Sequence, residues 1–193
     1  MSSAAQVTCS ECGATMLAAT AARTGGLCMA CKQGIRKHIE SAKVYYQQQR
    51  QPDPFRDYWR DLVRRVHAAP DGFFRLSPPE QTYFSVCLLD GEVYNGGMHQ
   101  FFYNSSGDYY AETLRGLEEL GAMRCHTLLV TACREFFPAG EPPRDTAVRR
   151  EILPEPSRDL DAIEKEYWSD PDKLGDRLRD YALRHHLVRP AAS

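Results

Sequence analysis

The stretch CSECGATMLAATAARTGGLCMAC, residues 9–31, decides how the N-terminus of this 193-residue chain folds. It contains two C-x2-C pairs, Cys9 with Cys12 and Cys28 with Cys31, and 15 residues separate the pairs. Two thiolates three positions apart can bind one metal ion from a tight turn, and a second pair at this distance completes a tetrahedron. The spacing therefore predicts one structural Zn²⁺ ion bound by these four cysteines.

The other three cysteines argue against a disulfide framework. Cys87, Cys125 and Cys133 bring the total to seven, so full pairing would leave one odd thiol. Thiols that stay free for metal are typical of a reducing compartment, and we therefore expect a cytoplasmic protein. No apolar run approaches the roughly 20 residues that cross a bilayer, so we expect no membrane association.

The segment after the second cysteine pair has a polar helical pattern that continues to about Gln49. Pro52 and Pro54 break this helix and mark a domain boundary. We expect a zinc module with its following helix over residues 1–50, of the treble-clef-like or ribbon-like kind, with the second cysteine pair at or near a helix start. A module of this size builds a sufficient core only with metal.

The remainder of the chain, residues 55–189, predicts a second domain that is all-α. Apolar residues recur at helical spacing in segment after segment, and no segment alternates with period two. The first such helix is strongly amphipathic, with Phe55, Tyr58, Trp59, Leu62, Val63 and Val66. Ser77 and Glu80 stand three positions apart, as a capping box at a helix start requires.

Three further features subdivide this helical domain. Asn95-Gly96-Gly97 predicts an interruption between two helical segments. Asp108 is a candidate N-cap for the helix that follows. The proline-rich region 138–157 indicates a surface connection that contains a short helix at 145–152.

Charge is distributed unevenly along the chain. The net charge is −2, but residues 1–71 carry 10 Lys/Arg against 6 Asp/Glu, whereas residues 72–193 carry 14 against 20. Basic residues follow the second cysteine pair, and two tyrosines that could stack on bases come next: Lys32, Arg36, Lys37, Lys43, Tyr45 and Tyr46. Nucleic-acid binding through the zinc module is thus one alternative function, although the pI of about 6.3 lies well below the range typical of such domains.

Catalytic motifs are missing from the sequence. It has no P-loop and no dinucleotide fingerprint. Cys87 and Cys133 lie within apolar patterns, and the neighbours Cys125 and His126 would point about 100° apart on a helix. We therefore expect that the protein is not an enzyme.

The stretch EVYNGGMHQFFYNSSG, residues 92–107, is the most distinctive part of the second domain. Its N-G-G-x-x-Q-F-F-x-N core, followed by a Leu-rich helix that ends at Leu120-Gly121-Ala122, resembles a bacterial family best known from a DNA mimic protein. The similarity covers roughly residues 55–187 and implies an all-helical domain that works by binding proteins. Within the motif we expect a mainly structural role, with pocket lining as the alternative, for Asn95, Gly96, Gly97, Gln100 and Asn104.

In the DNA mimic itself, carboxylates spaced like phosphates occupy the DNA site of a transcription factor. The acidic residues that could play this part here are Glu112, Glu118, Glu119, Asp159, Asp161, Glu164 and Glu166. Fourteen basic residues are interleaved with the acids of residues 72–193, so ordinary helix surface is the competing interpretation. The resemblance implies an inhibitor or adaptor that acts on a DNA-binding protein, toxin or nuclease through an acidic helical surface.

Overall fold

The computed structural model describes residues 5–155 and 159–189, with the backbone alone at residues 48–50 and 159. The chain divides into two compact units, Met1–Pro52 and Asp53–Ser193. The net charges of the two units are opposite in sign, because unit 1 carries 6 Lys/Arg against 2 Asp/Glu and unit 2 carries 18 Lys/Arg against 24 Asp/Glu. We keep the expected ranges, 1–50 and 55–189, as our proposal for the domains themselves.

Unit 1 combines a small hairpin with three helices. Strands β1 (Gln6–Thr8) and β2 (Thr15–Leu17) pair antiparallel, with Val7 opposite Met16. Helices α1 (Ala18–Thr24), α2 (Met29–Lys32) and α3 (Arg36–Arg50) follow. The first cysteine pair lies in the hairpin turn and the second at the start of α2, which is the treble-clef-like arrangement.

The secondary-structure elements among the described residues of unit 2 are all helices, as the sequence predicts. Helix α4 (Pro54–His67) begins at Asp53, whose side chain accepts from the backbone N–H of Phe55 at 3.0 Å. The short 3₁₀ helix η1 (Gly72–Arg75) precedes the long helix α5 (Pro78–Tyr103). At the start of α5, the Glu80 carboxylate accepts from the backbone N–H of Ser77 at 2.9 Å, which confirms the predicted capping box.

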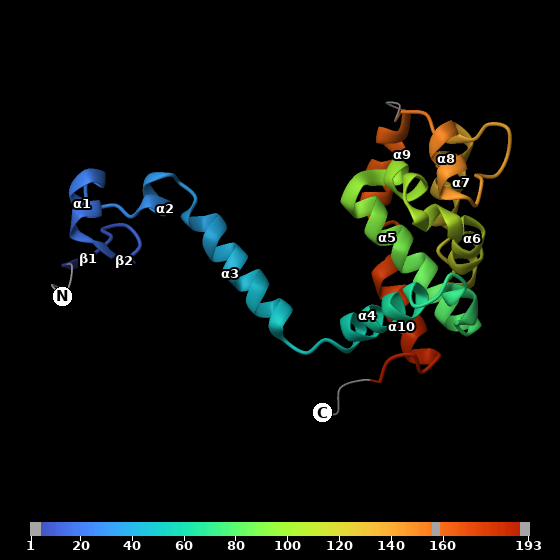
Figure 1. Cartoon of the computed structure of the whole chain (residues 1–193), viewed down its shortest axis with the longest axis horizontal. Helices are drawn as coiled ribbons and strands as arrows, with labels where there is room; N and C mark the ends of the chain where they lie inside the picture. The colour runs from blue at the N-terminus through green and yellow to red at the C-terminus, as the bar shows by residue number, and fades with distance from the viewer. Residues whose placement is uncertain (1–4, 156–158, 190–193) are drawn as a thin grey trace. The chain divides into compact units, whose positions relative to one another are not determined.

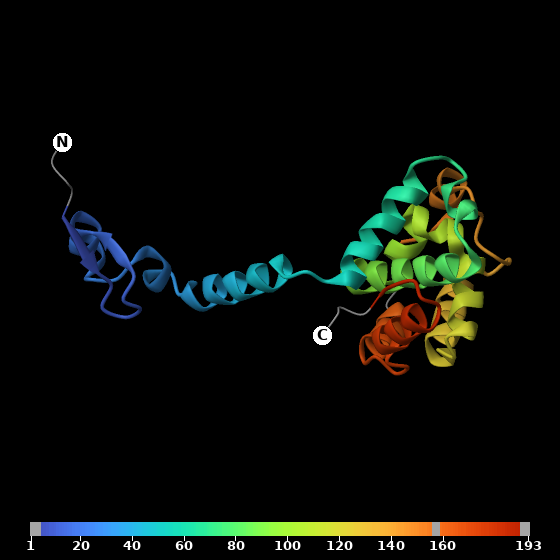
Figure 2. The same ribbon diagram turned by 90° about the horizontal axis from the view of Figure 1, so that it is seen from below.

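Helix α5 runs through the middle of unit 2, and the other helices pack around it (Figures 1 and 2). After α5 come η2 (Ser105–Tyr109), α6 (Tyr110–Glu119), α7 (Met123–Phe136), α8 (Thr146–Ile152), α9 (Asp159–Trp168) and α10 (Leu174–Arg184). The side chains that α5 contributes to the core are fully buried: Val86, Leu89, Val93, Met98, Phe101 and Phe102. Helix α5 is buried on more than one face, so its apolar residues do not form the single stripe of a surface helix.

The predicted interruption at Asn95-Gly96-Gly97 is a break inside α5. Gly96 has φ −159° and ψ 23°, and Gly97 has φ 80° and ψ −177°. The conformation of Gly97 is accessible almost only to glycine, because a Cβ would clash with the backbone. Two helical segments therefore meet at these glycines, as expected.

One local prediction for unit 2 was wrong, and a second was incomplete. Asp108 does not cap α6, which begins at Tyr110; it lies in η2, where its carboxylate accepts from Arg149 of α8. The short helix predicted within region 138–157 is confirmed as α8, but the region is not simply a surface connection. Within this region the side chain of Arg149 is completely buried, so the region also contributes to the interior of unit 2.

Candidate metal centre and the motif of the helical domain

The four N-terminal cysteines form one compact cluster. Their Sγ atoms all lie within 4.8 Å of one another, and the Sγ atoms of Cys12 and Cys28 are 3.8 Å apart. Sulfurs at the corners of a tetrahedron around zinc, at a Zn–S distance near 2.3 Å, are separated by about 3.8 Å. The donor set and its spacing therefore fit a metal ion. Within the described residues, no other group of His, Cys, Asp or Glu side chains meets this criterion.

The backbone of unit 1 directs the cysteines toward one another. In the hairpin turn, Cys9 donates its N–H to the carbonyl of Ala14 at 2.9 Å, and Gly13 closes the turn with φ 70°. At the second pair, Cys28 is the N-cap of α2, and its sulfur accepts from the N–H of Cys31 at 3.4 Å. The N–H of Cys28 points in turn at the sulfur of Cys9, at 3.2 Å.

These N–H groups favour negative charge on the sulfurs. The N–H of Cys31 and then the guanidinium of Arg36 lower the pKa of the Cys28 thiol to about 6. The N–H of Cys28 lowers the pKa of Cys9, whereas burial raises the pKa of Cys31 to about 12. Thiolates are the species that bind metals, and a bound dication would favour the deprotonated form of all four thiols.

Three of the four clustered cysteines also form the core of the unit. Cys9, Cys28 and Cys31 are its only buried apolar side chains among the described residues, with Met16, Leu27 and Ala30 packed against them. So small an apolar cluster stabilises little by burial alone. A metal ion bound to four sulfurs would supply the missing cohesion.

The remaining cysteines lie in unit 2 and are poor nucleophiles. Burial raises the pKa of Cys87 and of Cys125 to about 12, and it also raises the pKa of Cys133. His126, the sequence neighbour of Cys125, has its Nε2 atom 3.3 Å from the carboxylate of Glu118 instead. The His126 imidazole is therefore paired with a carboxylate and does not activate the Cys125 thiol.

Two amides of the N-G-G-x-x-Q-F-F-x-N motif, Gln100 and Asn104, converge on a carboxylate that its place in the sequence does not mark as their partner. Glu92 accepts from the side-chain amides of Gln100 at 2.5 Å and Asn104 at 2.9 Å, and from the hydroxyl of Ser106 at 3.0 Å. Asn95 is exposed on the surface. The Glu92 carboxylate thus ties the end of α5 to the beginning of η2.

A second carboxylate accepts a hydrogen bond from the backbone at the break in α5. Glu164 of α9 accepts from the backbone N–H of Met98 at 2.8 Å, immediately after Gly97. The first N–H groups of a helical segment have no partner within the helix, so this contact acts as a cap supplied by another helix. A Cβ on Gly97 would lie 2.7 Å from the Glu164 carboxyl carbon, which explains why this position must be glycine.

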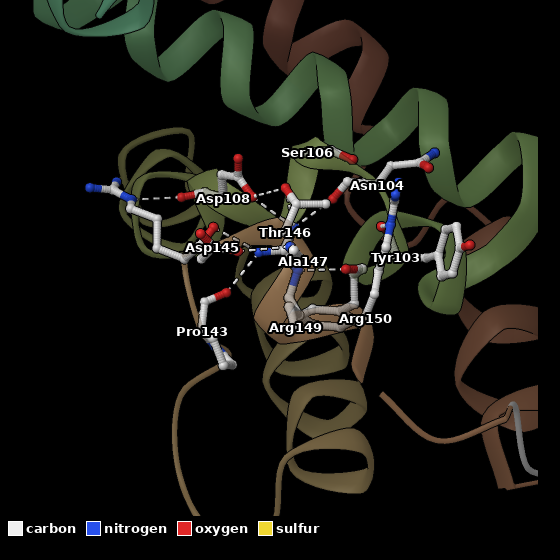
Figure 3. A network of polar contacts seen from close by, with 12 residues as sticks. Tyr103, Asn104, Ser106, Asp108, Pro143, Asp145, Thr146, Ala147, Arg149 and Arg150 are labelled. Carbon is white, nitrogen blue, oxygen red and sulfur yellow. Dashed lines mark hydrogen bonds and ion pairs between the residues drawn. The ribbon is translucent and has the colours of Figure 1, made fainter. Parts of the chain in front are cut away.

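Arg149 connects α8 to the end of α5 and to η2, as Figure 3 shows. Its guanidinium donates to the carbonyls of Phe102 at 2.5 Å and Asn104 at 2.6 Å, and to the carboxylate of Asp108 at 2.7 Å. The carbonyls of Pro143 and Arg144 accept from the remaining Nη atom. The five donors of a buried arginine are thereby used, as burial of this charge requires.

Most of the acidic side chains proposed for partner binding have partners within the chain. Glu112 is only 10% exposed and pairs with Arg144, and Glu166 accepts from Arg124, with one contact at 2.8 Å. The carboxylate of Glu164 accepts from the backbone N–H of Met98. The side chain of Asp159 lies outside the described residues.

Three of the acidic candidates remain on the surface. Glu118 is 57% exposed, and Asp161 is exposed on α9. Glu119 is also exposed, although its carboxylate accepts from the hydroxyls of Thr82 and Tyr181, each at 2.9 Å. The structure therefore does not bring the seven acids together as one uncompensated row.

Comparison with known protein families assigns the helical unit. A sequence model described as DMP19-like protein matches residues 74–186, which is more than half of the chain. The chain belongs to the DMP19-like protein family. This is the DNA mimic family that the N-G-G-x-x-Q-F-F-x-N motif resembles, so the predicted membership is confirmed.

The DMP19-like match leaves the cysteine cluster of unit 1 outside its bounds. Comparison with curated proteins and with solved structures finds no match. Among the described residues, none of the helices has the length and apolar character needed to cross a membrane.

Proposed function

We propose that this DMP19-like protein is a non-catalytic protein-interaction module, an inhibitor or adaptor that acts on a DNA-binding protein, toxin or nuclease. Membership of the DNA mimic family carries this proposal. The surplus of acidic residues in unit 2, 24 against 18 basic, supports a partner with a basic surface. The partner would be a protein that normally contacts phosphate groups.

The acidic surface that we propose is smaller than a full imitation of DNA. Phosphate contacts dominate DNA affinity, so an imitation needs dense negative charge without compensating cations. Arg124 and Arg144 compensate two of the acidic candidates within the chain. We therefore assign partner binding to the exposed carboxylates of Glu118, Glu119 and Asp161.

For the cysteine cluster we propose one Zn²⁺ ion, held by Cys9, Cys12, Cys28 and Cys31. Four thiolates close a tetrahedral coordination sphere and leave no position for a substrate or an activated water. The role would accordingly be structural, which agrees with a unit that has almost no other core. Free thiols in this number also support a cytoplasmic location in a bacterial cell.

A pull-down with the full chain from native-host lysate, with and without nuclease, tests the interaction. A discrete protein recovered in both conditions supports the adaptor or inhibitor function, whereas loss of every partner after nuclease treatment contradicts it. The recovered partner is then titrated with Glu118→Lys and with Asp57→Lys. Asp57 is an exposed acid of α4 outside the family match and serves as the control for total charge.

We expect Glu118→Lys to weaken binding several-fold at low salt, and Asp57→Lys to leave it nearly unchanged, because surface charge acts mainly over short distances in salt. Equal effects of both substitutions would show that the net charge of the unit, and not the proposed carboxylates, governs association.

A second candidate function rests on unit 1. This unit carries four more basic than acidic residues, and on α3 the side chains of Tyr45 and Tyr46 are 57% and 65% exposed. Cationic surface next to exposed aromatic rings suits single-stranded nucleic acid. Fluorescence anisotropy with a labelled oligonucleotide at several salt concentrations tests it: affinity that rises steeply as salt falls supports this function, and a flat response contradicts it.

A further inference from the structure

Arg36, the first residue of α3, lies against the cysteine cluster. Its Nη2 atom is 3.0 Å from the sulfur of Cys28, and its Nη1 atom is 3.2 Å from the carboxylate of Glu40 one turn further along the helix. The side chain is only 23% exposed, although most of α3 faces solvent. Glu40 thus holds one edge of the guanidinium while the other edge faces the sulfur.

The contact between Arg36 and Cys28 matters because the metal-bound cysteine cluster would carry a net negative charge. Four thiolates around one dication carry a net charge of −2, which is costly to hold in a partly buried cluster. A hydrogen bond from a cationic donor to a ligating atom offsets that charge and fixes the orientation of the ligand. Among the described residues, Arg36 is the cation that touches a sulfur of the cluster.

Helix α3 has few other attachments to the cluster. None of the described side chains from Arg36 to Gln47 is buried, so the helix has no packed face of its own. Isolated helices of about 15 residues are marginal in water. The backbone just before the helix is also attached to α2, where the N–H of Ile35 donates to the carbonyl of Ala30 at 2.9 Å.

We infer that Arg36 is a positioning residue of the metal centre: it neutralises and orients the Cys28 thiolate, and it couples metal binding to the folding of α3. This inference rests on the zinc site proposed above. Loss of Arg36 would lower metal affinity without removing a ligand, and the metal-bound state would contain a less complete α3.

The test compares Arg36→Met with Lys37→Met in the full chain. Both substitutions remove one positive charge from α3, but Lys37 is exposed and makes no described contact with a sulfur. Competition for zinc against a chromophoric chelator gives the affinities. We expect a loss of about 10- to 100-fold for Arg36→Met, the range found for residues that hydrogen-bond to metal ligands, and less than 3-fold for Lys37→Met.

Two further measurements separate positioning from general damage to the unit. Arg36→Lys keeps the charge and should recover part of the affinity, and the deficit of Arg36→Met should shrink in high salt, where the field of the lost cation is screened. With Co²⁺ as the probe, the sulfur-to-metal charge-transfer band should shift in Arg36→Met and stay in place in Lys37→Met. Circular dichroism during the zinc titration should show less helix gained by Arg36→Met than by the wild type.

Equal zinc affinities and equal helix gain for Arg36→Met and Lys37→Met would overturn the inference while leaving the zinc site intact. A wild-type chain that binds no zinc would instead overturn the proposed metal centre, and the role of Arg36 with it. A wild-type near-ultraviolet spectrum in every variant establishes that unit 2, which contains both tryptophans, is folded, and the helix gained on zinc binding reports on unit 1.

Discussion

The guanidinium of Arg149 lies 2.7 Å from the carboxylate of Asp108, although 41 residues separate them in the chain. Arg149 is completely buried and Asp108 is 29% exposed. This ion pair joins the short helix α8 to η2, and the carbonyls around Arg149 join it to the end of α5 (Figure 3). A buried cation from outside the family motif therefore holds the end of the motif segment in place.

Replacing Arg149 with Met should destabilise unit 2 by about 3–5 kcal/mol. The substitution leaves the Asp108 carboxylate and several buried carbonyls without a donor, and removal of one partner from a buried pair has effects of this size. Urea unfolding followed by tryptophan fluorescence measures the change. Arg150→Met is the matched control, because Arg150 is exposed and contributes one hydrogen bond to the carbonyl of Tyr103. It should cost about 1 kcal/mol, and similar losses in the two variants would show that burial of Arg149 is unimportant.

Gly107→Ala should destabilise unit 2 by roughly 1–3 kcal/mol, the usual range for overpacking. A Cβ at this position would lie 2.7 Å from Nε and 2.9 Å from Cζ of Arg149, so the buried guanidinium would have to move. Gly91→Ala provides the control, since Gly91 lies in α5 with no atom near the added Cβ. Alanine there should stabilise by roughly 0.5–1 kcal/mol through helix propensity. Thermal unfolding of both variants should therefore shift in opposite directions, and a shift in the same direction would contradict the assigned contact.

The break in α5 was predictable from sequence, whereas its cap was not. Two adjacent glycines after Asn95 signal an interruption because glycine alone tolerates such backbone angles without strain. The partner of the break, Glu164, is 66 residues from Met98, and its sequence neighbours give it the pattern of an exposed acidic helix face. Local sequence reveals where a helix stops, but it does not reveal which distant side chain satisfies the exposed N–H groups.

The same limit explains the outcome at Asp108 and Arg149. Asp108 precedes a helix at a spacing that suits an N-cap, and only the tertiary fold brings the competing guanidinium to it. Arg149 is followed by Arg150 and Glu151 in a proline-rich region, which resembles a solvated helix face. The cysteine pairs, in contrast, could be predicted from the sequence. One metal ion requires four ligands, and all four lie within 23 residues at the spacing of such sites. That requirement is visible in the sequence itself.

Glu164→Ala should cost unit 2 about 1 kcal/mol, as loss of an N-cap does. The variant removes the acceptor for the Met98 N–H and also a negative charge beside the start of a helical segment. Asp161→Ala removes an exposed acid from the same helix and should change stability by less than about 0.5 kcal/mol. Hydrogen exchange gives a local measurement, since the amide of Met98 should exchange faster in Glu164→Ala alone. Unchanged protection of that amide would contradict the capping role.

The stability of unit 2 should fall as the pH rises above the ordinary pKa of an aspartate carboxyl group, because of Asp90. Burial, with a contribution from Asp170, raises the pKa of Asp90 above 3.8, and the hydroxyl of Tyr167 lies 3.2 Å from its carboxylate. The unfolded chain then releases this proton at lower pH than the native chain, so stability falls through the interval between the two pKa values. Asp90→Asn should lack this fall and gain relative to the wild type above about pH 4. Glu135→Gln, at an exposed position of α7, should follow the wild-type profile, and parallel profiles for all three proteins would show that Asp90 does not titrate in this way.

Removal of metal should unfold the cysteine cluster and leave unit 2 unchanged. Binding of zinc by four thiolates contributes on the order of 10 kcal/mol to such modules, far more than the few apolar side chains around Cys9, Cys28 and Cys31 can supply. In a two-dimensional NMR spectrum, chelation should collapse the amide signals of residues 5–35 while the signals of residues 53–189 keep their positions. Cys9→Ser should have the same effect and should not retain one zinc per chain, whereas Cys87→Ser, which alters a cysteine of unit 2 that is not a member of the cluster, should retain zinc in full. One equivalent of zinc in the Cys9→Ser protein would refute the four-cysteine site, and collapse of both sets of signals on chelation would mean that unit 2 depends on the metal as well.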